Sequence, residues 1–94
     1  MNKYEMVLIL KADLSDDDRQ KVLDRLQEAI KADGSVETID DWGIRKLAYT
    51  IDYKKEGYYY VMHYEAEPSI VAEVERRARI LDSVLRYLTV KKEA

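Results

Sequence analysis

The sequence contains no cysteine, one histidine and only three glycines. Without cysteine the chain can form neither disulfide bonds nor thiolate metal sites, and a reducing cytoplasmic environment is the simplest fit. The glycines are isolated at Gly34, Gly43 and Gly57, so they cannot build the glycine-rich loop that binds phosphates. The only histidine, His63, lies between apolar residues and has no cysteine to accompany it in nucleophilic catalysis. We therefore expect no enzyme activity, no cofactor, no metal site and no small-molecule substrate.

Long hydrophobic segments are also missing. The apolar run Met6–Leu10 is flanked by Glu5 and Lys11 and is too short for a signal peptide or a membrane-spanning helix. We therefore expect a soluble protein that does not bind a membrane.

The 94 residues are enough for a single domain, which we place at residues 1–94. Hydrophobic residues make up 47% of the chain and charged residues 37%, a balance that allows a packed core and argues against intrinsic disorder. The net charge of −3 argues against a surface that coats nucleic acid broadly. However, residues 69–94 carry six basic and four acidic side chains. Any contact with RNA should therefore use a local patch, helped by a basic partner.

Alternation of apolar and polar residues predicts strands, and apolar residues at helical spacing predict helices. Ser15 followed by Asp16–Asp18 is a typical helix start, because the serine caps a free N–H and the acids face the positive end of the helix dipole. Successive helical residues diverge by about 100°, so these acids cannot converge on one metal ion. The predicted elements are a strand at 3–10, a helix that begins after Ser15 and is capped by Gly34, a long strand from Val36 to Tyr53, a turn at 54–57, a strand from Tyr58 to Glu67, a helix that opens at Pro68, and a strand from Val84 to Val90.

This order of elements predicts an α+β fold of the ferredoxin-like βαββαβ type. Right-handed crossovers give a four-stranded antiparallel sheet with both helices on one face. The other face of the sheet is left open.

The direction of the tyrosine-rich strand decides which of its residues face the helices. The strand loosely resembles the third strand of an RNA-recognition motif, in which alternate aromatic residues on the open face stack on bases. That arrangement would expose Tyr58 and Tyr60 but bury Glu65 unpaired beneath the helices, which is costly. The opposite arrangement buries Tyr60 and Tyr64 and leaves His63 and Glu65 in water, so we expect the opposite arrangement.

This choice leaves an apolar patch on the open face of the sheet. Exposed patches of this kind usually bind a protein partner or a second copy of the chain. The alternative is a patch that is only moderately exposed and binds nothing. The last strand is apolar on both sides, so Arg86, Leu88 and Val90 extend the patch in only one of its two orientations. The residues expected in the patch are Val7, Ile9, Tyr59 and Val61.

Two adjacent cations, Arg45 and Lys46, lie in the second strand close to the only tryptophan, Trp42. Strand alternation predicts that Lys46 faces the open side. Arg45 shares its side with Leu47, so either a bulge at Gly43 turns it or the strand has run past the helices there. The residues alone leave a binding role and a solvated strand end equally open.

The segment 43–51 reads G-x-R-x-L-A-Y-x-I and resembles the signature of the bacterial small-subunit ribosomal protein six family. The similarity extends through nearly the whole chain. Its length and the order of its elements agree with the family as well. Lys3-Tyr4-Glu5 resembles the family's opening, Gly57-Tyr58 its hairpin exit and Val90-Lys91 its ending. This signature is far more specific than an isolated glycine pattern.

The resemblance implies a non-catalytic component of the small ribosomal subunit in the cytoplasm. It also implies pairing with small-subunit ribosomal protein eighteen, and binding of the pair to the central domain of small-subunit ribosomal RNA. The alternative is a small regulatory or ligand-binding domain, because the fold alone does not determine function. By carry-over, the expected RNA contacts are Lys3, Arg45, Lys46, Arg86 and Lys91. The expected protein contacts are Trp42, Gly43, Ile44, Val7, Ile9, Tyr59, Val61 and Leu88.

Overall fold

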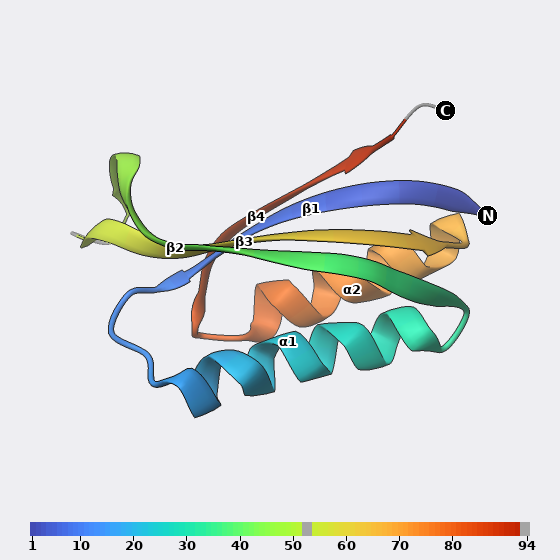
Figure 1. The fold of residues 1–94 in the computed structure, drawn as a ribbon, viewed down its shortest axis with the longest axis horizontal. Coiled ribbons are helices and arrows are strands. Elements are labelled where there is room, and N and C mark those ends of the chain that lie inside the picture. The colour runs from blue at the N-terminus through green and yellow to red at the C-terminus, as the bar shows by residue number, and fades with distance from the viewer. Residues whose placement is uncertain (52–53, 93–94) are drawn as a thin grey trace.

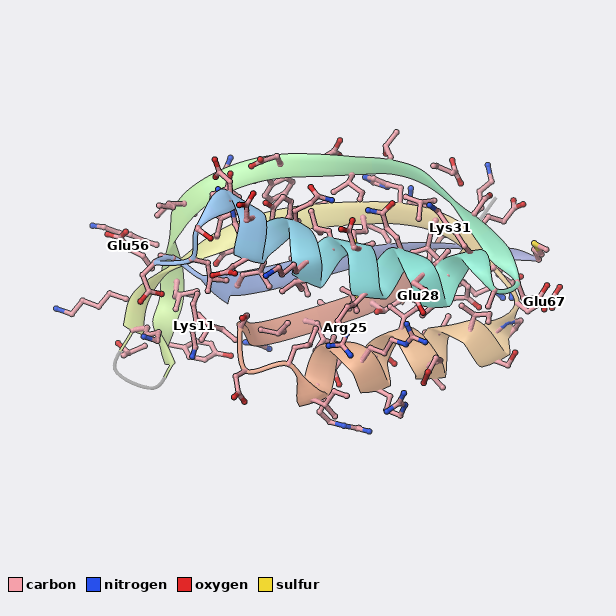
Figure 2. All side chains as sticks on the ribbon, turned by 90° about the horizontal axis from the view of Figure 1, so that it is seen from below. Lys11, Arg25, Glu28, Lys31, Glu56 and Glu67 are labelled. Atoms are coloured by element: carbon pink, nitrogen blue, oxygen red, sulfur yellow. The ribbon has the colours of Figure 1, made fainter. Side chains whose placement is uncertain are left out.

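The computed structural model describes residues 1–51 and 54–92 (Figure 1). These residues form β1 (Asn2–Lys11), α1 (Asp16–Lys31), β2 (Gly34–Ile51), β3 (Lys54–Ala66), α2 (Pro68–Ile80) and β4 (Val84–Lys91). The strands make one antiparallel sheet in the order β2-β3-β1-β4. Both helices lie side by side against one face of the sheet (Figure 1, Figure 2). The predicted ferredoxin-like fold is therefore confirmed.

The hydrophobic core lies between the sheet and the two helices. Tyr60 and Tyr64 are only 5% and 0% exposed, whereas His63 and Glu65 lie on the other side of β3 and keep contact with water. The predicted direction of β3 is thus confirmed, and its cause is the cost of burying an unpaired carboxylate. The residues at the centre of the core are Met6, Leu8, Leu10, Leu26, Ile30, Met62, Tyr64, Val74 and Ala78.

Helix α1 begins as its sequence predicts but ends differently. The Ser15 side chain accepts a hydrogen bond from the Asp18 N–H at 3.1 Å. The C-cap is Ala32, so the prediction that Gly34 caps the helix is wrong. Gly34 opens β2 instead, and a Cβ at this position would lie 2.3 Å from the Glu65 carbonyl oxygen. Glycine is therefore required here by the close approach of two strands.

The hairpin between β2 and β3 is longer than predicted. The predicted turn at 54–57 is wrong, because these residues belong to β3. The predicted end of the second strand at Tyr53 lies outside the described residues. We call residues 44–51 and 54–58 the hairpin arm. Figure 1 shows that the far end of this arm rises on the side of the sheet opposite the helices.

Candidate functional site

The face of the sheet opposite the helices, the open face, carries apolar residues on three strands. Val7 of β1 pairs opposite Leu88 of β4 on this face. Leu88 is 56% exposed and Val90 is 45% exposed, while Val7 and Tyr59 are partly buried. The orientation of the last strand, which the sequence left open, therefore places Leu88 and Val90 on the open face. We call Val7, Tyr59, Leu88 and Val90 the open-face patch.

Two residues predicted for this patch are buried instead. Val61 is 2% exposed and Ile9 is 9% exposed. Ile9 is covered because the hairpin arm folds onto the open face: a Cβ at Gly57 would lie 2.5 Å from Ile9 Cγ2 and 3.3 Å from Leu47 Cδ2. Val61 lies on β3, with a neighbouring strand on each side. The prediction that Ile9 and Val61 are exposed is therefore wrong, and both support the patch from within.

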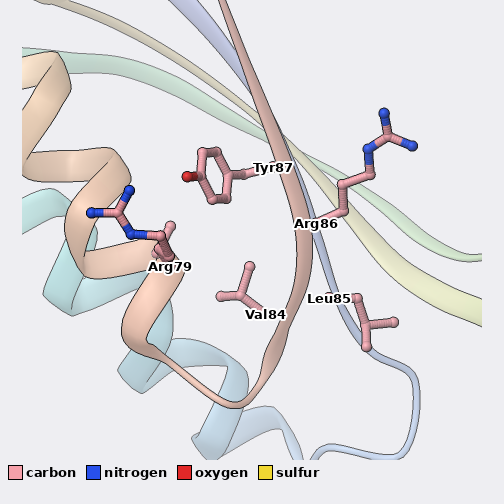
Figure 3. A pocket seen from close by; sticks show the side chains of 6 residues that line it. Arg79, Val84, Leu85, Arg86 and Tyr87 are labelled. Carbon is pink, nitrogen blue, oxygen red and sulfur yellow. The ribbon is translucent and has the colours of Figure 1, made fainter. Parts of the chain in front are cut away.

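The open-face patch contains an apolar hollow of about 180 Å³ between β1 and β4. Figure 3 shows a different pocket, beside α2 and β4, and with it both sides of β4: Tyr87 and Val84 point toward Arg79 of α2, whereas Arg86 points to the opposite side. The Arg86 guanidinium lies 5.5 Å from the centre of the Tyr49 ring in the hairpin arm, a cation–π contact. A cation is thus held beside the hollow, which is lined by Val7, Ile9, Arg86, Tyr87 and Leu88.

The five predicted RNA-binding cations do not converge on one site. Lys91 pairs opposite Tyr4 and Arg86 pairs opposite Ile9 of the same strand, β1. Because a strand rises about 3.3 Å per residue, these two positions are roughly 17 Å apart. The cations therefore form two groups at opposite ends of the sheet, the first consisting of Lys3 and Lys91 and the second of Arg45, Lys46 and Arg86.

Trp42 is the extra residue of a bulge in the edge strand β2. Asp41 pairs opposite Tyr60 and Gly43 opposite Tyr59, which leaves Trp42 without a pairing partner on β3. Gly43 has a φ of +73°, a left-handed conformation that glycine adopts without strain. As a result the Trp42 side chain is 47% exposed at the edge of the sheet.

The bulge also decides the directions of the two cations that follow it. Arg45 pairs opposite Gly57 and lies on the side of the open face, whereas Lys46 pairs opposite Glu56 and lies on the side of the helices. The prediction that Lys46 faces the open side is wrong, because one inserted residue reverses strand alternation. The Arg45 guanidinium lies 5.0 Å from the centre of the Trp42 ring, and its Nε–H donates to the Trp42 carbonyl oxygen at 3.4 Å.

Asp41 holds this bulge, a role that was not predicted from its sequence. Its Oδ1 accepts a hydrogen bond from the Gly43 N–H at 3.0 Å, and its Oδ2 accepts one from the Tyr58 hydroxyl at 2.9 Å. The hydrogen bond to Asp41, together with burial, raises the pKa of Tyr58 to about 12. Aspartate two residues before a glycine is typical of an Asx turn, so a local signal was present in the sequence.

A second polar cluster crosses the open face near the end of β4. His63 Nε2 lies 3.1 Å from Asp40 Oδ2, and His63 Nδ1 contacts the Lys92 ammonium. Because an ammonium can only donate, Nδ1 must be the acceptor, and the ring proton is on Nε2. The cluster contains no hydroxyl or thiol side chain. Within residues 1–51 and 54–92, no three histidine or carboxylate side chains are grouped to hold a metal ion.

The sequence profile of the family described as "Ribosomal protein S6" matches residues 3–91 of this chain. The chain belongs to the ribosomal protein S6 family. Among its S6 relatives, the small ribosomal subunit protein bS6 of Alkaliphilus oremlandii is 40% identical over 93 residues, which cover 99% of each chain. The protein of the same name from Caldanaerobacter subterraneus subsp. tengcongensis is 40% identical over 92 residues, 97% of each chain.

Two solved structures are similar to this S6-family chain in fold. The 30S ribosomal protein S6 of Thermotoga maritima aligns with a TM-score of 0.88 at 24% identity, over 97% of this chain and 87% of that one. A protein of Arabidopsis thaliana aligns with a TM-score of 0.58 at 14% identity, over 100% and 95%. At these identities the likeness shows the shared fold and nothing about function.

Membership in the S6 family confirms the expected place of this chain in the cell. S6 proteins are structural, non-enzymatic components of the small ribosomal subunit, so the chain is a small-subunit protein located on the ribosome in the cytoplasm. The family match therefore favours the ribosomal interpretation over a regulatory or ligand-binding domain of the same fold. In the part of the chain that the structure describes, no helix is long and apolar enough to cross a membrane.

Proposed function

We propose that this S6-family chain binds central-domain small-subunit ribosomal RNA as a pair with small-subunit ribosomal protein eighteen. The observation that supports this proposal most is the open face of the sheet, where an apolar hollow lies beside an exposed arginine. Binding energy between proteins is concentrated where one partner fills such a hollow with a large side chain. Arginine beside the hollow provides a contact for RNA phosphates at the margin of the same interface.

The protein partner docks on the open-face patch. Leu88 is the most exposed apolar residue of this patch, and the hollow beside it has room for one large apolar side chain. Gly43 and Ile44 of β2, which were also predicted as protein contacts, lie at the opposite edge of the sheet, where Ile44 is 53% exposed on the helix side of the strand, so we leave them out of this docking surface. Ile9 and Val61 contribute by holding the patch in shape rather than by direct contact.

RNA phosphates contact the two groups of cations. In the first group, the Lys3 ammonium lies 3.8 Å from the Glu37 carboxylate, so Lys91 is the stronger contact of that group. In the second group, Arg45, Lys46 and Arg86 are all exposed near the hairpin arm. Because the net charge of the chain is −3, the chain alone should bind RNA weakly. The basic partner supplies the remaining attraction, so the pair should bind tightly.

The test measures RNA affinity against salt concentration, with and without protein eighteen. The double variant Arg86→Glu and Lys91→Glu should weaken the ternary complex and lower the slope of log K against log salt by about two, since each lost phosphate contact removes roughly 0.9. The matched control is Lys21→Glu and Lys31→Glu, which makes the same change of charge on α1, on the helix side of the molecule (Figure 2). Normal assembly of the first variant, or an equal loss in both, would contradict the RNA contacts.

A second pair of variants tests the protein surface. Leu88→Ser should weaken pairing with protein eighteen in the absence of RNA, measured by calorimetry or light scattering. Ile80→Ser is the control, because Ile80 is 59% exposed at the end of α2, away from the open face. Unchanged pairing of the Leu88→Ser variant would remove the open-face patch as the docking surface.

A further inference from the structure

Trp42 and Arg45 form an exposed pair at the edge of the sheet. Trp42 is the only tryptophan of the chain and is 47% exposed, so packing of the core does not explain it. The Arg45 guanidinium lies 5.0 Å from the centre of its ring. Among the described residues, Arg45 makes no ion pair with a carboxylate. An aromatic surface and a cation are thus available together.

The pair is fixed in place before anything binds to it. Asp41 bonds the Gly43 N–H on one side and the Tyr58 hydroxyl on the other, which holds the bulge that presents Trp42. Arg45 is in turn held by its hydrogen bond to the Trp42 carbonyl oxygen. A ligand that uses both side chains loses less conformational entropy than it would with two freely moving ones.

The pair is also separate from the surface that we assign to the protein partner. Trp42 lies on β2 and Leu88 on β4, which are opposite edges of the sheet. Three strand spacings of about 4.8 Å put roughly 14 Å between these edges. A partner anchored in the hollow between β1 and β4 therefore leaves Trp42 accessible.

We propose that Trp42 and Arg45 bind one unpaired nucleotide of RNA. The base stacks on the exposed part of the indole ring, and the Arg45 guanidinium donates hydrogen bonds to the phosphate. Bases inside a duplex have no free face, so the nucleotide belongs to a loop, a bulge or a strand end. This inference rests on the proposed RNA binding, and it assigns Trp42 to RNA rather than to protein eighteen.

The test follows Trp42 alone, by ¹⁹F NMR of this chain labelled with 5-fluorotryptophan. The label gives one resonance because the chain has one tryptophan. We expect little change when protein eighteen is added and a clear shift when central-domain RNA is added to the pair. A shift with protein eighteen and none with RNA would assign Trp42 to the protein partner and overturn the inference. No shift in a complete complex would overturn it as well but leave the proposed function standing, whereas failure of the unsubstituted chain to form any complex would overturn both.

Two variants distinguish stacking from a merely apolar contact. Trp42→Leu should weaken RNA binding by the pair about tenfold, whereas Trp42→Tyr keeps an aromatic face and should stay within about threefold of the parent. Pairing with protein eighteen should be unchanged in both, in contrast to Leu88→Ser. Equal losses for Trp42→Leu and Trp42→Tyr would overturn the stacking role. A thermal melt of each variant checks that the fold is retained, as expected for a side chain this exposed.

Discussion

Replacement of Asp41 by alanine removes both hydrogen bonds that hold the bulge at Trp42. These bonds run from the Gly43 N–H at 3.0 Å and from the Tyr58 hydroxyl at 2.9 Å. Each contributes about 1 kcal/mol at a partly exposed position, so the free energy of unfolding should fall by about 2 kcal/mol. For a chain of this length, such a loss lowers Tm by roughly 10 °C.

A double-mutant cycle separates the two bonds. Tyr58→Phe removes only the hydroxyl and should cost about 1 kcal/mol in a denaturant titration. The combined variant Asp41→Ala and Tyr58→Phe should cost less than the sum of the two single changes, by a coupling of about 1 kcal/mol. The part of the Asp41→Ala loss that exceeds this coupling measures the hydrogen bond from the Gly43 N–H.

The same bond also predicts how stability depends on alkaline pH. The pKa of Tyr58 is raised from 10.0 to about 12, mainly by its hydrogen bond to Asp41. A group whose pKa is higher in the folded state contributes stability that is fully present below pH 10 and is lost as the pH rises to 12. Asp41→Ala should therefore lose less stability than the parent over this range.

Asp40→Ala is the matched control, because Asp40 is the adjacent exposed aspartate and contacts His63 rather than the bulge. It should show no coupling with Tyr58→Phe. A coupling below about 0.3 kcal/mol for Asp41, within the scatter of independent sites, would refute the idea that this carboxylate holds the bulge through Tyr58. So would equal alkaline stability curves for Asp41→Ala and the parent.

Three further changes test the core and the surface. Leu26→Ala at a fully buried position should lower the free energy of unfolding by about 3 kcal/mol in urea, and a loss below 1 kcal/mol would contradict its central place. The Tyr64 hydroxyl is buried without a hydrogen-bond partner among the described residues, and burial raises the pKa of Tyr64 to about 12. Tyr64→Phe should therefore keep or increase stability at pH 7, by up to about 1 kcal/mol, and should lose less of it between pH 10 and 12; a clear loss at pH 7 would show that the hydroxyl is bonded. Hydrogen bonds from Arg76 and Arg77 lower the pKa of Glu73 from 4.5 to about 2, so the stability it contributes is present above pH 4.5 and is lost as the pH falls to 2. Glu73→Gln should flatten the dependence of Tm on pH in that range, and an unchanged curve would show that the pairing is not maintained in solution.

Much of the regular fold can be predicted from the sequence, because one dominant contribution to the free energy decides the orientation or the start of each element. The direction of β3 depends on Glu65. The opposite orientation of this strand, with Tyr58 and Tyr60 in water, would bury the Glu65 carboxylate unpaired under the helices. The start of α1 depends on Ser15 and three aspartates at the positive end of the helix dipole. In both cases the competing arrangement is less stable, and better packing of other residues cannot offset the difference in free energy.

The hairpin arm could not be derived in the same way. The register between β2 and β3 shifts three times, between Val36 and Thr38, between Asp41 and Gly43, and between Lys46 and Ile51. An odd shift reverses which residues face each side, so alternation in the sequence stops reporting direction after the first bulge. Of these shifts, only the one at Trp42 has a glycine that marks it, so the number of inserted residues before Lys46 could not be counted from the sequence, and Lys46 was placed on the wrong side.

Contacts across the open face were unpredictable for a different reason. Asp40 and His63 are 23 residues apart, and His63 and Lys92 are 29 apart. Local patterns contain no information on such pairs, which form only after the sheet has set its register. The packing of Ile9 over Gly57 of the hairpin arm is of the same kind, because it depends on how the arm lies against β1.

The sequence left open the directions of Arg45 and Arg86, two residues to which we assign binding, and the physics of the sheet explains why. At regular positions of a strand, every second side chain must fill the core, and the directions of the side chains between them follow by alternation. These directions therefore cannot be adjusted to suit a ligand. A bulge, a strand end or an arm beyond the helices is free of that requirement. Trp42 forms a bulge and Arg45 follows it, Lys91 ends β4, and Arg86 lies against the arm. Their directions are set by local bonds such as those of Asp41, so a change at Asp41 should alter RNA binding while the core remains folded.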